Sequence, residues 1–375
     1  MPLTLTDEQT MLRDTARDFV AERAPVSHLR HLRDTNDPTG FSRDLWKRFA
    51  EMGFTGILIG EDQGGLGLGH VEAGVVLEEI GRNLSPSPFL STAVGAVEAL
   101  KGTPHADRWF PGILAGDTVA ALAIDEGPKH DASIGMTAQR SGNGFRLSGA
   151  KQFVAHGHVA DIVIVAARTA GSAGDEDGVT LFAVPRDTPD IVTEPRRLAD
   201  ASLSSRITFA DIQIDADAVI GDVDAGGAIL ARVLAAGRTG AAAELLGVGG
   251  GAMGMTIDYL KQRKQFGQPI GSFQALQHRA AHLYAELEVA RAAVLKAQQL
   301  LDAGDLGADT AVSVAKAMAG MATTLAVQEG IQMHGGIGMT DEYDIGFYMK
   351  RARVLAELFG DANFHADRLA RAAGY

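Results

Sequence analysis

Residues 263–274 of this sequence are Arg263-Lys264-Gln265-Phe266-Gly267-Gln268-Pro269-Ile270-Gly271-Ser272-Phe273-Gln274. The guanidinium of Arg263 can hold a pyrophosphate through paired, charge-assisted hydrogen bonds, because its donors form a rigid fork. Phe266 offers a flat apolar surface, and the amide of Gln274 can both donate and accept a hydrogen bond. The alternative is an ordinary junction between two helices with a Gly-Pro turn. Together these side chains suit a cofactor that contains a pyrophosphate, but the residues by themselves leave both interpretations open.

Two other segments are rich in glycine, which lets another group approach the backbone because it has no Cβ. One is Gln332-Met333-His334-Gly335-Gly336-Ile337-Gly338-Met339-Thr340-Asp341-Glu342-Tyr343. The other is Gly60-Glu61-Asp62-Gln63-Gly64-Gly65-Leu66-Gly67-Leu68-Gly69, followed by the run Val76 to Arg82. No strand-turn-helix unit with a downstream acidic residue surrounds the second segment, so it is not a dinucleotide fingerprint. We interpret it as a structural loop.

Together these segments resemble the acyl-CoA dehydrogenase family, and the resemblance covers most of the chain. It implies an FAD-dependent oxidoreductase acting on acyl-CoA thioesters. It also implies that FAD is bound by Arg263, Phe266, Gln274, Gln332, Gly335 and Gly336, and that Arg238 contacts the substrate. The implied fold is an α+β multi-domain one, with an N-terminal helical domain, a β-barrel-like middle domain and a C-terminal four-helix bundle that carries dimer and tetramer contacts.

The pattern along the chain has the same helix, sheet, helix order. Thr6 is a plausible N-cap, and helical spacing continues to about Leu114. Strand patterns then follow at residues 119–124, 145–154, 161–167, 179–184 and 205–214. Long helical patterns return from Gly227. We therefore expect domains at 1–117, 118–223 and 224–375, with the acidic run 170–178 as a solvated hairpin loop.

Composition limits the function classes. The chain has 375 residues, 46% of them hydrophobic. We expect no stretch that is apolar for long enough to span a bilayer, and no signal peptide at residues 1–8. Its formal charge of −13 argues against nucleic acid, which requires a basic patch. With no cysteine it has no disulfide or thiolate metal site. We expect a cytoplasmic protein without a metal, and we interpret His156 and His158 as structural.

The catalytic base of the family is missing. In the family a glutamate removes the α-proton of the acyl-CoA while a hydride passes from the β-carbon to flavin N5. Of its two alternative positions, one matches Phe359 and the other matches Gly237, next to Arg238. Glu357, Asp361 and Glu244 are nearby acids. If the segment around Phe359 is helical, its two neighbours project to different faces, and Glu244 more often pairs across helices.

The flavin-ring contacts of the family are also changed. Its Thr/Ser-Glu-Pro run corresponds to Ile124-Asp125-Glu126-Gly127-Pro128, which places a carboxylate where the family has a hydroxyl. A buried, unpaired carboxylate there would cost several kcal/mol, on the order given for isolated charges. Its Trp-x-Thr element corresponds to Phe153-Val154-Ala155, so a second hydroxyl is absent.

In the family each FAD lies between two subunits, and one chain supplies the Arg, Gln and Gly-Gly groups to the ADP portion of its neighbour's flavin. This chain keeps that half and loses the other. It resembles the non-catalytic subunit of actinobacterial heteromeric acyl-CoA dehydrogenases, several of which act on steroid side-chain CoA thioesters. The resemblance implies a partner chain in an α2β2 complex, in β-oxidation of fatty acids or steroid side chains.

Two other hypotheses stay open. A self-sufficient homo-oligomer with a displaced base would bind one flavin per chain when purified alone. A binding or scaffold protein of the same fold would be colourless both alone and with every encoded neighbour. The sequence does not identify the acyl group.

Overall fold

The computed structural model describes residues 2–131, 133–175 and 177–375. These form two compact units. Unit 1 contains the residues up to Thr35, residues 70–86 and residues 238–375. Unit 2 contains residues 36–69 and 87–237.

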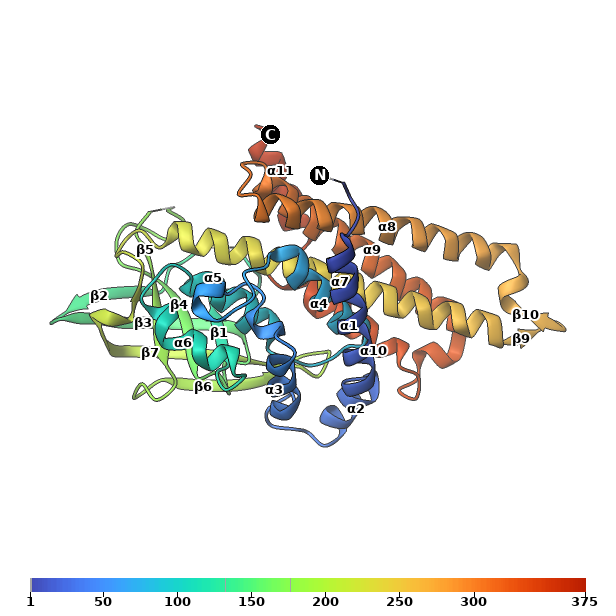
Figure 1. Cartoon of the computed structure of the whole chain (residues 1–375), viewed down its shortest axis with the longest axis horizontal. Coiled ribbons are helices and arrows are strands. Elements are labelled where there is room, and N and C mark those ends of the chain that lie inside the picture. The colour runs from blue at the N-terminus through green and yellow to red at the C-terminus, as the bar shows by residue number, and fades with distance from the viewer. Residues whose placement is uncertain (1, 132, 176) are drawn as a thin grey trace. The chain divides into compact units, whose positions relative to one another are not determined.

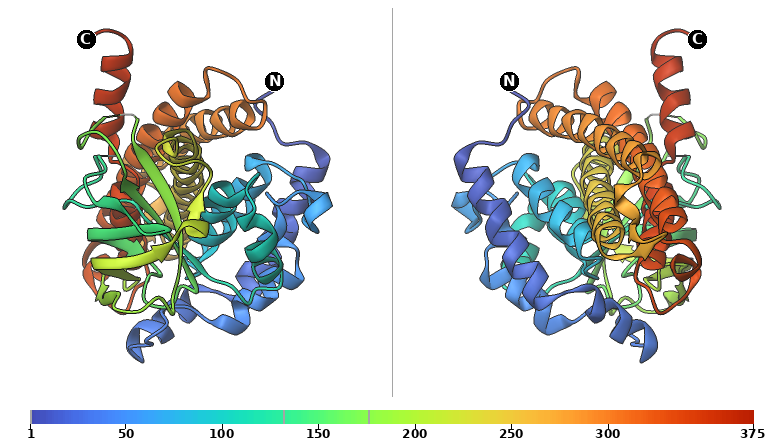
Figure 2. Two further views of the ribbon diagram at one scale, coloured as in Figure 1. Left: turned by 90° about the vertical axis from the view of Figure 1, so that its left-hand side faces the viewer. Right: turned by 90° about the vertical axis from the view of Figure 1, so that its right-hand side faces the viewer.

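Unit 1 is helical (Figure 1). Its helices are α1 (Asp7–Arg23), α2 (Val26–Asp34), α4 (His70–Arg82), most of α7 (Gly227–Gln262), α8 (Gln274–Asp302), α9 (Ala308–His334), α10 (Ile345–Glu357) and α11 (Ala362–Ala372), with 3-10 turns at Ile270–Ser272 and Gly335–Met339. The long helices α8 and α9 lie side by side, and α10 and α11 pack on α9 (Figures 1 and 2).

The first helix begins where the sequence predicts. The Thr6 hydroxyl accepts a hydrogen bond from the Gln9 amide, and the Gln9 side chain accepts one from the Thr6 amide. This reciprocal pair satisfies two amides that the first turn leaves without helical partners. Further along, α1 is tied to α4 by Arg17, which donates to the fully buried Glu79 at 2.9 Å.

Helices α4 and α7 approach each other at two glycines. A Cβ added at Gly247 would lie 1.9 Å from the Glu78 carbonyl oxygen, and one added at Gly81 would lie 2.1 Å from the Glu244 carbonyl oxygen. Neither position can carry a side chain without separating the two backbones. The crossing therefore explains why both helices contain glycine, which helix propensity disfavours.

One sequence expectation was wrong for α9. The segment Ala308–Met339 is long and apolar enough to span a membrane by length and composition. However, 61% of its most apolar window is buried inside the protein, where α8, α10 and α11 pack against α9. Small and apolar residues are needed all round such a helix because it is covered on several sides. The burial fits a core helix.

Unit 2 combines short helices with one β-sheet. The helices are α3 (Arg43–Glu51), α5 (Val97–Leu100) and α6 (His105–Leu114), with a π-helical segment at Leu90–Ala96 and 3-10 turns at Phe54–Gly56, Glu61–Gln63 and Ala216–Ala218. The strands are β1 (Ala120–Ala123), β2 (Thr137–Ser141), β3 (Gly144–Ala155), β4 (Ile162–Arg168), β5 (Val179–Pro185), β6 (Val192–Arg197), β7 (Leu203–Asp215) and β8 (Val219–Ile220).

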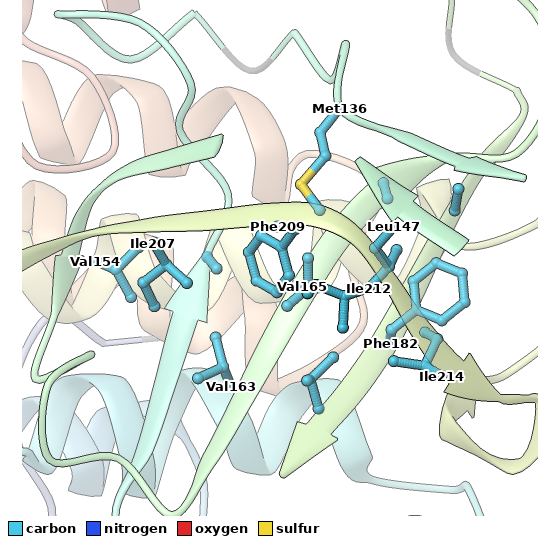
Figure 3. Packing of buried hydrophobic residues seen from close by; sticks show 14 of the residues in the cluster. Met136, Leu147, Val154, Val163, Val165, Phe182, Ile207, Phe209, Ile212 and Ile214 are labelled. Atoms are coloured by element: carbon cyan, nitrogen blue, oxygen red, sulfur yellow. The ribbon is translucent and has the colours of Figure 1, made fainter. Parts of the chain in front are cut away.

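The sheet has the order β6-β7-β3-β2-β4-β5-β8, and β1 pairs with β4 in parallel. Side chains of β3 and β7 and of β4 and β5 meet in one core, which includes Leu147, Val165, Phe182 and Phe209 (Figure 3). The rings of Phe145 and Phe182 pack edge to face with centroids 5.3 Å apart. The sheet thus curls around a core, although the order ends at β6 and β8.

The glycine-rich segment 60–69 is a loop of unit 2. Its amides donate to carbonyls of the same region, as in Gly65 to Gly60 at 3.0 Å and Leu66 to Gly56 at 2.9 Å. A Cβ at Gly65 would lie 2.2 Å from the Ile59 carbonyl oxygen. The close packing of the loop on itself supports the structural interpretation.

Candidate functional site

The predicted cofactor segment forms a small hairpin after α7. Strand β9 (Lys264–Gln265) pairs antiparallel with β10 (Gln268–Pro269). The two turn residues, Phe266 and Gly267, have φ of 53° and 80°, the pattern of a two-residue hairpin turn. A left-handed φ is uncommon for a bulky residue. The Phe266 side chain is 90% exposed. The hairpin therefore presents an aromatic ring to the outside.

Arg263 and Gln274 stand at the two ends of this segment. The Arg263 amide donates to the Tyr259 carbonyl at 2.8 Å, and its own carbonyl accepts from the Ile270 amide at 2.8 Å. Its backbone is thus fixed, while its side chain is exposed and makes no ion pair with the described residues. Gln274 is the first residue of α8 and is exposed as well.

The second predicted element lies at the end of α9. Gln332 is exposed on the last turn of the helix, and Gly335 and Gly336 follow it, also exposed. Gly335 has φ 64° and ψ −140°, a conformation essentially restricted to glycine. A Cβ added at either glycine would meet no described atom within 4 Å. The backbone here borders open space into which another group can fit.

The segment around Phe359 is a turn, so the helical premise of the sequence analysis was wrong. Helix α10 ends at Glu357, and Phe359 and Gly360 have φ of 59° and 104°. The Phe359 side chain is 7% exposed. Two buried cations hold this turn by its carbonyl oxygens: Arg238 Nε donates to Phe359 at 3.2 Å, and Lys316 Nζ donates to Gly360 at 2.9 Å and to Ala356 at 3.0 Å.

The surroundings change the acid–base properties of Lys316. Burial, reinforced by the positive charge of Arg238, lowers the pKa of Lys316 to about 7. Arg238 itself is 3% exposed, and its guanidinium carbon lies 5.5 Å from the centre of the Phe364 ring. In this arrangement Arg238 supports the turn, and its predicted contact with a substrate stays a prediction.

The three candidate acids are engaged elsewhere. Glu357 pairs with Arg353 at 2.9 Å. Asp361 caps α11 by accepting a hydrogen bond from the Phe364 amide at 2.8 Å. Glu244 is 3% exposed and pairs across helices with Arg351 Nη2 at 2.5 Å, as expected for such a residue. Each of these carboxylates therefore has a structural partner.

In unit 2 the expected unpaired carboxylate is in fact paired. Asp125 accepts a hydrogen bond from Nδ1 of the buried His130 at 2.6 Å. The expectation was wrong because the turn after Asp125 folds back and brings His130 to it. The next residue, Glu126, accepts a hydrogen bond from the buried Lys151 at 2.6 Å, and burial lowers the pKa of that lysine. Apart from their five-residue spacing, nothing in the sequence indicates that Asp125 and His130 pair.

The end of β3 carries the other changed flavin-ring residues. The pairing of β3 with β7 shifts register between Lys151 and Val154, which places Phe153 in a left-handed conformation, 48% exposed. Ala155 ends the strand without a hydroxyl. His156 bonds to Ser91 at 3.2 Å and His158 bonds to the Thr39 carbonyl at 3.2 Å, so both have structural contacts.

No group of three possible metal ligands occurs among the described residues. The acidic run 170–178 joins β4 to β5, and its Glu176 lies outside the described residues. The buried Arg168 donates to the carbonyls of Asp175 and Asp177 in this loop.

Three family models match successive parts of the chain. They are Acyl-CoA dehydrogenase, N-terminal domain, over residues 6–117; Acyl-CoA dehydrogenase, middle domain, over residues 126–215; and Acyl-CoA dehydrogenase, C-terminal domain, over residues 224–374. The chain belongs to the acyl-CoA dehydrogenase family. The predicted acyl-CoA dehydrogenase fold, with N-terminal helical, middle β and C-terminal helical domains, is confirmed, as is membership of this FAD-dependent oxidoreductase family.

Individual acyl-CoA dehydrogenases resemble the chain over nearly its whole length. Acyl-CoA dehydrogenase FadE12 of Mycobacterium tuberculosis is 32% identical over 358 residues, which cover 93% of this chain and 91% of the relative. Acyl-CoA dehydrogenase IpdE2 of Mycolicibacterium smegmatis is 31% identical over 366 residues, which cover 97% and 98%.

Two solved structures of hetero-oligomeric proteins are also similar. A variant of the Tcur3481-Tcur3483 steroid ACAD is 31% identical with a TM-score of 0.89, covering 99% of this chain and 100% of that chain. The ChsE4-ChsE5 complex from Mycobacterium tuberculosis is 25% identical with a TM-score of 0.90, covering 100% of both chains. Acyl-CoA dehydrogenase homologues thus include chains that assemble with a different chain.

The two units differ in how well they fit FAD, the cofactor of acyl-CoA dehydrogenases. In unit 1, the exposed Arg263 cation and the open space beside Gly335 and Gly336 suit the charged ADP portion. In unit 2, the positions predicted to contact the flavin ring hold the Asp125–His130 pair and Ala155, where the family has hydroxyl groups. The chemistry of the donor set therefore fits the nucleotide half better than the flavin ring.

Proposed function

We propose that this chain is a non-catalytic acyl-CoA dehydrogenase subunit that completes the flavin site of a catalytic partner chain. The observation that carries the proposal is the contrast within unit 1. The side chains that we assign to the nucleotide are exposed, whereas Phe359, at the predicted base position, lies buried in a turn held by Arg238 and Lys316. A subunit that donates one half of a shared site needs the first feature and not a base.

In such a complex this chain would hold the ADP portion of the partner's FAD. Arg263 would bind the pyrophosphate through its guanidinium, and the Gln274 and Gln332 amides would add hydrogen bonds. Gly335 and Gly336 would admit the nucleotide to their backbone, and Phe266 would cover an apolar face. FAD supplies the hydride acceptor of the reaction, and the partner supplies the base.

The proposed assembly is an α2β2 complex that dehydrogenates an acyl-CoA thioester at the α,β positions in the cytoplasm. Similarity to the Tcur3481-Tcur3483 steroid ACAD and to the ChsE4-ChsE5 complex supports a two-chain assembly. The steroid ACAD also makes a steroid-type acyl group our first candidate substrate, with fatty acyl-CoA as the second.

The test compares the chain purified alone with the chain co-expressed with a second acyl-CoA dehydrogenase chain. The second chain must carry a glutamate at one of the family's two alternative base positions. Alone, it should retain little FAD and form no enoyl-CoA with an artificial electron acceptor. A missing general base lowers the rate by about 10²–10⁴-fold. Co-expression should give a stable complex with bound flavin and turnover. Stoichiometric flavin and ordinary turnover by the chain alone would contradict the proposal.

The second candidate is a self-sufficient homo-oligomer, and one observation favours it. Because Asp125 is hydrogen-bonded to His130, its carboxylate does not present the unpaired charge that argued most strongly against flavin binding. This candidate predicts one flavin per chain in the protein purified alone.

A further inference from the structure

Three aromatic rings in unit 1 form one cluster that joins segments far apart in the sequence. The His334 ring stacks on Tyr259 with centroids 4.5 Å apart and an interplanar angle of 28°. The same ring packs on Tyr343 at 4.9 Å. Tyr259 and Tyr343 meet edge to face at 6.0 Å. We call Tyr259, His334 and Tyr343 the three-ring cluster.

Each nucleotide-facing element begins next to a ring of this cluster. Tyr259 lies one helical turn before Arg263, whose amide donates to the Tyr259 carbonyl at 2.8 Å. His334 directly precedes Gly335 and lies two residues after Gln332. The stacked pair therefore fixes the end of α7 against the end of α9. It does so one residue from the glycine turn and four residues from the arginine.

His334 makes a second contact that a purely apolar ring would not make. Its Nδ1 lies 2.6 Å from the Gly330 carbonyl oxygen, and since a carbonyl only accepts, Nδ1 carries the proton. This bond ties the ring to the backbone of its own helix, one turn before α9 ends. Nε2 is buried and has no hydrogen-bond partner among the described residues. The ring is 3% exposed, so Nε2 is not placed to contact a ligand.

The segment that carries the third ring is tied to α2 by two ion pairs. Arg30 pairs with Asp344 at 2.5 Å, and Arg33 pairs with Asp341 at 2.5 Å. These two ion pairs flank Tyr343 in the sequence. The guanidinium carbons of both arginines also lie 4.7 Å from the centre of the Phe347 ring. The segment after Gly335 and Gly336 is thus anchored at both ends.

We infer that His334, stacked on Tyr259 and packed against Tyr343, is a positioning residue that locks the two proposed nucleotide-facing elements into one preformed platform. The inference rests on the proposed function, because it assigns the platform to FAD. His334 does not touch the cofactor. It acts through the backbone of Gly335 and through the end of α7, so that little ordering remains to be done when the nucleotide binds.

The experiment uses three variants that separate the two contacts. His334→Phe keeps the ring and loses the Nδ1 donor, His334→Asn keeps a donor near the Nδ1 position and loses the ring, and His334→Ala loses both. The first readout is hydrogen–deuterium exchange of residues 332–344 in the chain alone. The second is the FAD dissociation constant of whichever assembly retains FAD.

His334→Ala should speed exchange in residues 332–344 but not in α11, and should weaken FAD binding about three- to tenfold, as expected for loss of aromatic pairs. His334→Phe should recover most of the lost affinity, which a general loss of fold would not allow. If His334→Ala does not fold, Tyr343→Ala tests the same contact at a half-buried position. Wild-type exchange and FAD affinity in the Ala variants would overturn the inference.

Arg263→Ala separates failure of this inference from failure of the proposed function. If Arg263→Ala weakens FAD binding and His334→Ala does not, the platform is wrong while the nucleotide site stands. If neither variant changes FAD affinity but His334→Ala speeds exchange, the cluster orders the segment and the proposed function is wrong.

Discussion

Two regions of unit 1, one around Arg263 and Gly335 and one around Phe359, differ in whether their polar groups are bonded within the chain. Around Arg263 and Gly335 the backbone is hydrogen-bonded within the chain, while the Arg263 side chain is exposed and the space beside Gly335 is open. Around Phe359 the turn carbonyls accept hydrogen bonds from Arg238 and Lys316, and elsewhere on α10 Arg351 pairs with Glu244. The proposed function requires this difference: exposed binding groups that a partner chain could use, and a position predicted to carry the family's base that now has a structural role.

The largest expected effect tests whether Glu244 is structural. Glu244→Ala leaves the partly buried Arg351 without its carboxylate, and we expect the free energy of unfolding to fall by about 3 kcal/mol, the lower end for breaking a buried pair. Urea denaturation measures it. Asp367→Ala, which removes the exposed partner of Arg371, is the control and should change stability little. A fully stable Glu244→Ala protein that loses turnover would instead make Glu244 the missing base.

Substitution of Arg263 tests the region around Arg263 and Gly335. Arg263→Ala should weaken FAD binding by the complex about ten- to a hundredfold, equivalent to about 1.5–3 kcal/mol for charged hydrogen bonds, and leave complex formation intact. Arg263→Lys should recover only part, since a point charge cannot reproduce the fork. Flavin per complex and enoyl-CoA formation at limiting FAD provide the measurement. Arg371→Ala is the matched exposed control. Unchanged flavin content in Arg263→Ala would remove the distinction between the two regions.

The pH dependence of stability tests the region around Phe359, through the buried Lys316. Its pKa is about 7 when folded and near 10.5 in the unfolded chain. Between these values the unfolded state binds more protons, so the free energy of unfolding should rise with pH, by at most about 1.4 kcal/mol per unit. Below pH about 7 this contribution should be constant. Lys316→Met should flatten the slope between pH 7.5 and 9.5 relative to wild type. Equal slopes in both proteins would show that the lysine stays charged.

The smallest expected change is that of Phe359→Glu in the chain alone. A carboxylate at this turn restores the residue type of the base but not the ring-side groups at Asp125 and Ala155. Enoyl-CoA formation should therefore stay at background, level with the Phe359→Gln control. A gain of about a hundredfold over that control, the scale of a general base, would mean that the rest of the site is intact.

The long helices were predictable because their signals are local. The Thr6 cap and the helical spacing after it depend on neighbours in sequence, and the structure confirms both. Strands β2 and β6 were missed. Strand β2 reads Thr-Ala-Gln-Arg-Ser and is largely exposed, and β6 contains Pro195 at the edge of the sheet. Such strands lack the apolar alternation that marks a half-buried strand, and they form because β3 and β7 offer partners.

The site was predictable as a set of residues but not as a set of contacts. Phe359 was predicted to replace the base, and this stays a prediction, but the turn that holds it depends on Arg238 and Lys316, which reach it from distant helices. Asp125 was judged to be unpaired because no pattern in sequence identifies His130 as its partner. Contacts of this kind are decided by tertiary structure, where propensity and spacing carry little information.

The crossing of α4 and α7 restricts which residues evolution can place at two positions, Gly81 and Gly247. Gly81 and Gly247 each face a carbonyl oxygen of the opposite helix at a distance that excludes any Cβ. Glycine inside a helix costs about 0.8–1.0 kcal/mol relative to alanine. A change to alanine at either site would therefore improve its own helix and at the same time force the pair apart. Selection for stability therefore keeps glycine at both positions, although alanine has the higher helix propensity. In protein design, either glycine can be replaced only if the two helix backbones are also moved apart.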